Sequence, residues 1–290
     1  MDNQQQLINK INIQPYERRY RAAVNDLLFR SNRVHTHLDW HDAQTWIDLT
    51  DVPILLAWHG SRLVGVMAAS QPMGGTCWLR IIAIADALPA RPLLHRLWQD
   101  MCAVLKQMHI HTVGLLIISD WLSNYVAQLG FSYTEDIITL QRDGTYVPPA
   151  KSKPPIIRNA SNDDLPRLVE VDHMAFVPPW QLSSNDLRQA KRIAATCTVA
   201  TQDDTIIGYQ LSTVFRKSGH LARLAVTPET QGKGIGSALL DQLIRQFSRR
   251  GVTTITVNTQ STNIKSQRVY AYYGFERNGY DLPVWMASIT

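Results

Sequence analysis

The sequence has few cysteines, and those present form no pattern that would pair them. Cys77, Cys102 and Cys197 are far apart, odd in number and outside any C-x-x-C motif. A disulfide framework and a cysteine zinc site are therefore not expected, and a reducing compartment, the cytoplasm, is predicted.

Long apolar runs are also absent. The N-terminal stretch, MDNQQQLINK, has no apolar region of the kind found in a signal peptide. Runs such as VGLLII and IIAIA are much shorter than the roughly 20 residues of a membrane-spanning helix. No association with a membrane is expected.

Charged residues are few, at 18% of 290, and the net charge is only +5. This small basic excess suits an anionic ligand. The chain has no Lys/Arg run and no aromatic-basic interleaving, so nucleic acid is not expected as a partner. Hydrophobic residues make up 45%, enough for sizeable cores, and the length favours two domains.

Near its midpoint the sequence does contain a proline-rich segment, DGTYVPPAKSKPP, at residues 143–155. Proline fixes its own φ and restricts the residue before it, so an extended, semi-rigid linker is predicted. This linker would separate one domain at residues 1–142 from another at residues 156–290.

The two halves resemble each other at nearly constant offsets. Gly65 and Gly208 are 208 − 65 = 143 positions apart, in similar strand-turn-strand contexts. LRIIAIADALPARPLLHRLW matches LARLAVTPETQGKGIGSALL at an offset of 221 − 79 = 142, and AQLGFSYTE matches AYYGFERNG at 274 − 130 = 144. Three similar offsets in the same order indicate a tandem duplication.

Hydrophobic periodicity and turn residues predict the element order β-α-α-β-β-β-α-β-α-β-β for the second copy. This is an α/β arrangement, a mixed sheet with helices on both faces. The helix that begins at residue 235 is predicted from an apolar face. That face consists of Ile235, Leu239, Leu240, Leu243, Ile244 and Phe247.

A loop with three glycines and a lysine, QGKGIG, precedes this helix. A Walker P-loop requires G-x-x-x-x-G-K-[ST], but Thr227 stands at its first position and Gly234 follows Lys233. A Rossmann fingerprint requires G-x-G-x-x-G directly after a strand, but the glycines here read G-x-G-x-G and TPETQ intervenes. The sequence therefore excludes both nucleotide-binding loops.

What remains is the spacing of Gln231, Gly234 and Gly236 after a strand that ends in Ala-Val-x-Pro. This spacing resembles the GNAT superfamily of acyl-CoA N-acyltransferases, whose loop reads [RQ]-x-x-G-x-[GA]. The free N–H groups of a helix's first turn attract an anion, and glycines let the backbone approach a pyrophosphate. The resemblance implies two tandem GNAT-like domains and acetyl-CoA as co-substrate, with no metal.

A second GNAT-like stretch, NTQSTNIKSQRVYAYYGF, follows downstream. Helical spacing places Asn263, Ser266 and Tyr270 on one face. The resemblance implies that Asn263 contacts the coenzyme A arm and that Tyr270 is the general acid beside the thioester sulfur. The residues expected to bind acetyl-CoA are Leu224, Ala225, Val226, Gln231, Gly232, Lys233, Gly234, Ile235, Gly236, Ser237, Asn263, Ser266 and Tyr273.

The general base is the open part of this mechanism. The acceptor amine must lose a proton, and family members often hold a carboxylate on the strand before the loop. That strand reads HLARL here and has no acid. The remaining candidates are His220, Glu170, Asp172 and His173, while Glu229 is interpreted as a loop residue.

The first copy resembles the same fold without its chemistry. Pro89, Pro92 and Leu94 replace the loop's glutamine and glycines, and Ser119 and Val126 replace the asparagine and the tyrosine. Proline has no N–H for a phosphate, so this copy is not expected to bind acyl-CoA in the usual way. Shaping the substrate cleft, holding the interface between the copies and forming a homodimer are roles left open.

A histidine-rich segment, HTHLDWHD at residues 35–42, has residue types that can bind a metal. No second cluster with clear ligand spacing accompanies it. A polar loop or a helix cap is the better interpretation, and no metal site is predicted.

The sequence thus predicts that the C-terminal copy transfers acetyl from acetyl-CoA to a primary amine by direct attack in a ternary complex. VDHMAFVPPW and SSNDL also resemble ribosomal-protein-alanine N-acetyltransferases. A protein N-terminus, a lysine and a small amine remain open as acceptors. The alternatives are a small-molecule acetyltransferase resembling mycothiol synthase and a non-catalytic acyl-CoA sensor or interaction module.

Overall fold

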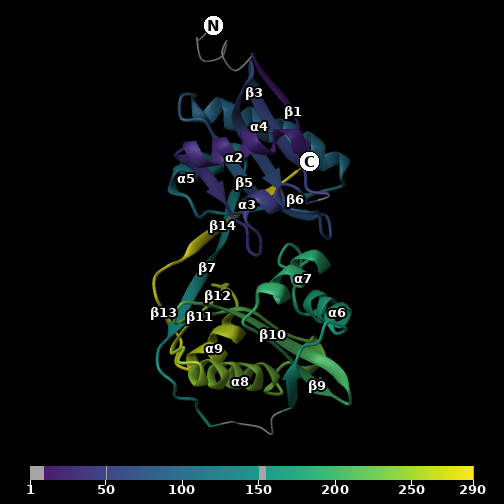
Figure 1. Ribbon diagram of the computed structural model, residues 1–290, viewed down its shortest axis with the longest axis vertical. Coiled ribbons are helices and arrows are strands. Elements are labelled where there is room, and N and C mark those ends of the chain that lie inside the picture. Colours follow the sequence, from purple (N-terminus) through teal and green to yellow (C-terminus); the bar gives the residue numbers. More distant parts are fainter. Residues whose placement is uncertain (1–9, 50, 150–154, 290) are drawn as a thin grey trace. The chain divides into compact units, whose positions relative to one another are not determined.

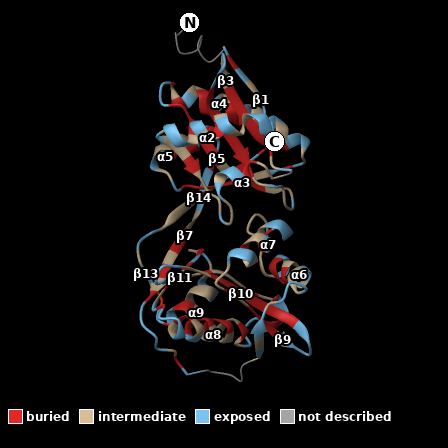
Figure 2. Ribbon diagram, viewed as in Figure 1, coloured by how far each residue is buried: buried red, intermediate tan, exposed pale blue. Residues whose placement is uncertain are grey.

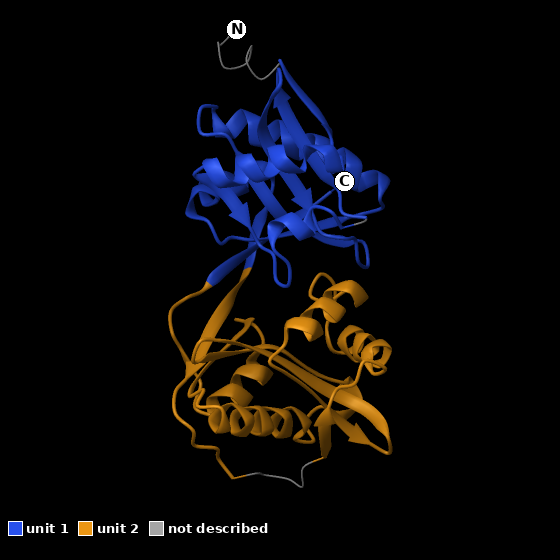
Figure 3. Ribbon diagram, in the orientation of Figure 1, with its two compact units in different colours: residues 1–134, 282–290 blue, residues 135–281 orange. Residues whose placement is uncertain are grey.

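The structure is a computed structural model that describes residues 10–49, 51–149 and 155–289. The chain divides into two compact units, coloured blue and orange in Figure 3. The first unit combines Met1–Thr134 with Leu282–Thr290, and the second is Glu135–Asp281. The division differs from the predicted boundary at the proline-rich segment, of which residues 150–154 lie outside the described residues.

The first unit contains a mixed sheet. Its elements are β1 (Ile11–Pro15), α2 (Arg21–Arg30), β2 (Arg33–Thr36), α3 (Ala43–Trp46), β3 (Ile54–His59), β4 (Arg62–Ala69), β5 (Thr76–Ile84), α4 (Ala90–Gln107), β6 (Thr112–Leu116), α5 (Asp120–Val126) and β14 (Leu282–Ser288). The strands follow the spatial order β1-β3-β4-β5-β6-β14, and β2 also pairs with β5 (Figure 1). Only β5 and β6 are parallel among these pairs of described strands.

The second unit repeats this plan. Its elements are β7 (Ser132–Arg142), β8 (Ile156–Asn159), α6 (Leu165–Ala175), α7 (Ser184–Ile193), β9 (Thr196–Gln202), β10 (Thr205–Phe215), β11 (Ser218–Val226), α8 (Ile235–Arg249), β12 (Thr254–Gln260), α9 (Ile264–Tyr272) and β13 (Glu276–Arg277). The strands follow the order β8-β9-β10-β11-β12-β7, with β11 and β12 parallel. The predicted α/β class and the predicted order of elements are confirmed.

Registers in the two sheets support the duplication. β5 begins its parallel pairing with Thr76 opposite Thr112, and β11 begins with Ser218 opposite Thr254. Both partners are displaced by 142, since 218 − 76 and 254 − 112 give the same value. The two sheets are therefore built from corresponding residues, in agreement with a tandem fold.

The two copies have exchanged one strand. β7 follows the first copy in sequence, yet it pairs antiparallel with β12 of the second unit. β14 follows the second copy, yet it pairs antiparallel with β6 of the first unit. Each sheet is thus completed by a strand from the other half of the sequence.

The core of the second unit lies beneath α8, whose six predicted core residues are all buried. In Figure 2 the buried positions follow the strands and one side of this helix. None of the helices in the described ranges is long and apolar enough to cross a membrane.

Candidate active site

A groove of about 1270 Å³ opens in the second unit between the end of β11, the start of α8 and α9. The predicted residues that line it are Leu224, Val226, Gln231, Gly232, Lys233, Gly234, Ile235, Gly236, Ser237, Asn263, Ser266, Tyr270 and Tyr273. Ala225 does not line it: this residue is buried and pairs with Tyr209 of β10. The two motifs, separated in sequence, are thus brought to one groove.

Gly234 shapes the entrance of α8. It is the N-cap residue, with a left-handed φ of 83° that favours glycine. The first backbone bond of the helix runs from the N–H of Ala238 to the carbonyl of Gly234, at 2.9 Å. The N–H groups of residues 235–237 precede this bond, so they are available to an anion in the groove.

β11 contributes an open edge to the same groove. β12 pairs only with Ser218–Leu221, while β10 covers the other edge of β11 up to Val226. Within the described ranges no strand pairs with residues 223–226 on the side facing away from β10. Their backbone groups can therefore pair with an extended ligand, as in strand addition.

Tyr270 is almost completely buried, at 5% exposure, in the wall of the groove. Its ring packs against Phe275, with centroids 5.7 Å apart. Its hydroxyl has no hydrogen-bond partner among the described residues. Burial raises the pKa of this hydroxyl above its usual value, so it carries its proton at neutral pH and can donate it.

The other residues of the second motif are partly committed to the fold. Asn263 caps α9, its side-chain oxygen accepting from the N–H of Ser266 at 3.2 Å, and its amide nitrogen is not used in this bond. Tyr273 donates its hydroxyl to the carbonyl of Ser237 at 2.9 Å and so joins α9 to α8. Burial raises the pKa of Tyr273 to about 12.

A set of cations that the sequence motifs did not indicate surrounds the groove. Besides Lys233, the basic residues that line it are Arg245, Arg249, Lys265 and Arg268. Asp241 also lines it and accepts a bond of 2.8 Å from Arg245. The spacing of residues 241, 245 and 249 along one helical face could have indicated this rim. A cationic rim fits a ligand that carries several phosphates.

None of the four base candidates lines the groove in the described part of the chain. His220 bonds through Nδ1 to the hydroxyl of Thr256 at 2.9 Å, and burial lowers its pKa. Glu170 is exposed and paired with Arg167 at 2.7 Å. His173 donates from Nε2 to the carbonyl of Leu182 at 3.0 Å.

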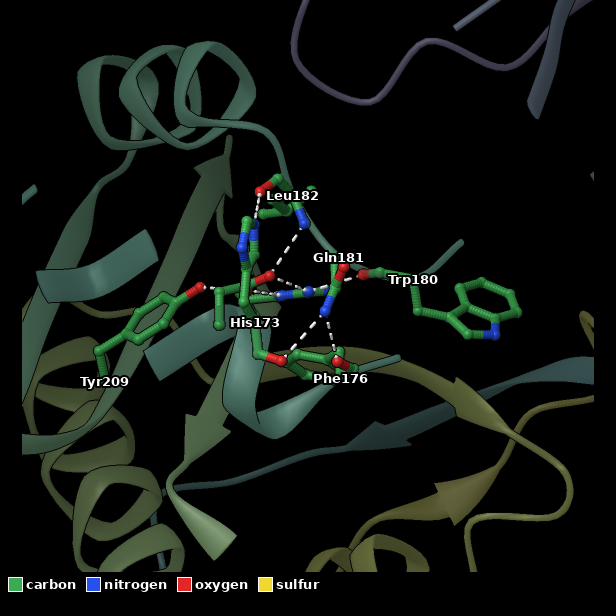
Figure 4. A network of polar contacts seen from close by, with 8 residues as sticks. His173, Phe176, Trp180, Gln181, Leu182 and Tyr209 are labelled. Carbon is green, nitrogen blue, oxygen red and sulfur yellow. Dashed lines mark hydrogen bonds and ion pairs between the residues drawn. The ribbon is translucent and has the colours of Figure 1, made fainter. Parts of the chain in front are cut away.

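Asp172, the fourth candidate, is fully buried in the network drawn in Figure 4. Its carboxylate accepts two bonds from Arg223, at 2.7 and 2.8 Å, one from the Tyr209 hydroxyl at 2.6 Å and one from the Leu182 N–H at 2.9 Å. A carboxylate has about four acceptor positions, so all are used. Asp172 is therefore a structural anchor and not a base.

Phe176 links this network to the groove. Its ring lies 3.6 Å from the guanidinium carbon of Arg223, and it lines the groove. Arg223 also donates to the carbonyl of Trp180 at 2.7 Å, and Gln181 donates to the carbonyl of Phe176 at 3.0 Å (Figure 4). Side-chain bonds thus hold the segment after α6 so that one aromatic residue forms part of the groove wall.

The histidine-rich segment of the first unit lies partly in a strand. His35 belongs to β2, and Asp42 caps α3 by accepting from the N–H of Thr45 at 2.8 Å. The predicted helix cap is confirmed, while the strand is new. Among the described residues no three His, Cys, Asp or Glu side chains lie close enough to share a metal.

Comparison with known proteins is consistent with this geometry. The pattern of the acetyltransferase (GNAT) family matches residues 165–275. An uncharacterized N-acetyltransferase of Methanocaldococcus jannaschii is 31% identical over 122 residues, which are 41% of this chain and 77% of that protein. The chain belongs to the GNAT family. It is therefore an acetyltransferase.

Two further relatives match the second copy of this GNAT protein. Both are ribosomal protein bS18-alanine N-acetyltransferases. That of Haemophilus ducreyi is 28% identical, over 44% of this chain and 90% of its own length. That of Escherichia coli is 27% identical, over 41% and 79%.

Solved structures share the fold of the whole chain. A tandem GNAT protein from the clavulanic acid biosynthesis pathway aligns with a TM-score of 0.64 and 14% identity, covering 97% of this chain and 99% of that one. A probable N-acyltransferase from Enterococcus faecalis aligns with a TM-score of 0.74 and 11% identity, covering 96% and 72%. The tandem GNAT arrangement predicted from sequence is confirmed at the level of the fold.

Proposed function

We propose that the second copy transfers the acetyl group of acetyl-CoA to a primary amine by direct attack in a ternary complex. The observation that carries this proposal is the Tyr270 hydroxyl, which lies in the same groove as the N-terminus of α8 and has no hydrogen-bond partner among the residues that the structure describes. The groove thus offers both free N–H groups with cations for phosphates and a proton donor for a departing thiolate.

Different residues of the groove would bind different parts of acetyl-CoA. Residues 235–237 and the cationic rim would hold the phosphates of acetyl-CoA, which supplies the thioester when bound. The open edge of residues 223–226 would hold the extended arm. Tyr270, with its raised pKa, would hydrogen-bond the sulfur and give it a proton as the thiolate departs.

The acceptor we favour is the α-amino group of a protein or peptide. Relatives of the second copy act on an alanine of a ribosomal protein. An α-amine has a pKa near 8 and a lysine amine one near 10.4, so the α-amine is far more often neutral at pH 7. Because Asp172 is saturated and Arg223 stands beside it, an acceptor that loses its proton easily suits this site.

Arg223 occupies the strand where an acid would serve as base, so the acceptor amine needs a direct test. Two measurements on the full chain test the proposal. Isothermal titration should show acetyl-CoA binding. Release of coenzyme A thiol should follow with a peptide that begins with alanine, and should be weaker with an N-terminally blocked peptide that contains lysine. Binding of acetyl-CoA without release of thiol from either peptide or from small amines would overturn the proposal that the acceptor is an amine.

A further inference from the structure

The first unit differs from the second in the segment that corresponds to one border of the groove. Residues 31–42 connect α2 to α3, and their counterpart in the second unit is the shorter segment of residues 176–183 between α6 and α7. In the second unit this segment borders the groove through Phe176. In the first it contains the additional strand β2.

β2 lies in the fork between β5 and β6. β6 pairs with Thr76–Trp78 of β5, whereas β2 pairs antiparallel with Ile81–Ile84. β4 covers the opposite edge of β5, so β2 and β6 share one edge. At the offset of 142, residues 81–84 correspond to residues 223–226, the open edge of β11.

Side chains that correspond to the site of the second unit contact β2. Ser119 stands at the N-cap position of α5, as Asn263 does at α9. Unlike Asn263, its side chain makes no capping bond, and its hydroxyl donates to the carbonyl of Val34 at 3.0 Å. At the same N-terminal end of β2, the neighbouring residue Arg33 donates to the carbonyl of Leu88, just before α4, at 2.7 Å. Both segments that hold the ligand in the proposed site therefore hold β2 here.

We propose that the first unit retains a binding site for an extended chain and that its own β2 fills this site, in the place that the arm of acetyl-CoA takes in the second unit. The comparison with the arm rests on the proposed function. The chemistry is shared, because an extended arm with amide groups and a β-strand both pair with an open strand edge. The filled edge excludes acyl-CoA from the first unit even before the prolines of its loop are considered.

His35 is the central side chain of this strand. It is 0% exposed, and neither ring nitrogen has a hydrogen-bond partner among the described residues. An imidazole in that position fills space as an apolar group does. The histidine-rich segment is thus part of an internal ligand.

Hydrogen exchange of the full chain, with and without acetyl-CoA, tests the proposal. Amides of residues 33–36 and 81–84 should exchange slowly in both conditions. Those of residues 223–226 that point away from β10 should exchange faster and slow down when acetyl-CoA binds. Fast exchange of residues 81–84 in the free protein would overturn the proposal. Slowing of the same residues by acetyl-CoA would overturn it as well.

His35→Pro removes a strand N–H, and His35→Leu is its matched control because it keeps the backbone donor. The proline variant should exchange residues 81–84 at least about tenfold faster than the leucine variant. Equal rates would contradict the role of β2. If acetyl-CoA protects no residue of either unit, the proposed function fails. Slow exchange of residues 81–84 that is lost only in His35→Pro would still support the filled site in the first unit.

Discussion

Arg223 holds Asp172 at two points, with Nε 2.7 Å from one carboxylate oxygen and Nη2 2.8 Å from the other. The pair joins β11 to α6 and supports the ring of Phe176 at the groove. The cation Arg223 thus stands on β11, the strand on which family members often hold a carboxylate, and its partner Asp172 is fully buried.

Breaking this pair should destabilise the second unit. Asp172→Asn leaves the largely buried Arg223 without a counter-charge, a change that typically costs about 3–5 kcal/mol. The free energy of unfolding from urea denaturation measures the loss. Asp26→Asn is the matched control, because Asp26 pairs with Arg30 on an exposed helix surface. This variant should lower the free energy of unfolding by less than about 0.5 kcal/mol. Equal losses in both variants would contradict the anchoring role.

Removing the Tyr270 hydroxyl should slow turnover and spare binding. Proton donation of this kind contributes about 10²–10⁴-fold, so kcat of Tyr270→Phe should fall within that range. The affinity for acetyl-CoA, measured by titration, should change little. Tyr272→Phe, which loses a bond to the carbonyl of Pro149, should retain turnover. A Tyr270→Phe variant as active as the parent would reject the general-acid role.

The two glycines at the ends of α8 provide a matched pair. Gly234 and Gly251 have φ values of 83° and 71°, so alanine at either position should cost about 1–2 kcal/mol of stability. Only Gly234→Ala should also weaken acetyl-CoA binding, because Gly234 directly precedes the N–H groups of residues 235–237 that border the groove. If both variants bind equally well, the loop is not the phosphate site.

Acid should destabilise the first unit through His35. Burial, with His37 and Arg80 nearby, lowers its pKa from 6.5 to about 4. The unfolded chain therefore takes up a proton near pH 6.5 and the folded chain only near pH 4, so stability falls as the pH drops through this window, by up to about 3 kcal/mol. His35→Leu should show a smaller fall between pH 7 and pH 4 in urea denaturation. An unchanged pH dependence would show that His35 is not the group responsible.

Fragments should follow the strand exchange and not the proline-rich segment. A fragment of residues 135–281 keeps the part of β7 that pairs with β12, Ile137–Arg142, and should be monomeric by size-exclusion chromatography. A fragment of residues 156–290 lacks β7, leaves an edge of β12 unpaired and should aggregate. Monomeric behaviour of both fragments would show that β7 is dispensable.

The local features of the active copy could be predicted from sequence because they depend on short-range patterns. The apolar face of α8, the glycine at its N-terminus and the spacing from Asn263 to Tyr270 all read directly from neighbouring residues. The strand exchange could not be predicted in this way. The sequence of β14 predicts a strand, but nothing in it indicates that this strand pairs with β6 of the first unit.

β2 was missed for a related reason. Its histidines are polar residues, which do not predict a buried strand. The segment forms a strand because it pairs with the open edge of β5. Likewise, Asp172 was considered as a base because its partner Arg223 lies 51 positions away. Contacts between distant positions, and not propensity, decided these elements.

The location of β14 has a consequence for synthesis on the ribosome. Domains generally complete their folding from the N-terminus as the chain emerges. Here the first unit needs residues 282–288, which are made only after every residue of the second unit, since that unit ends at position 281. The first unit, although its synthesis begins first, should therefore complete its folding second, and its sheet should lack the partner of β6 until β14 has been made.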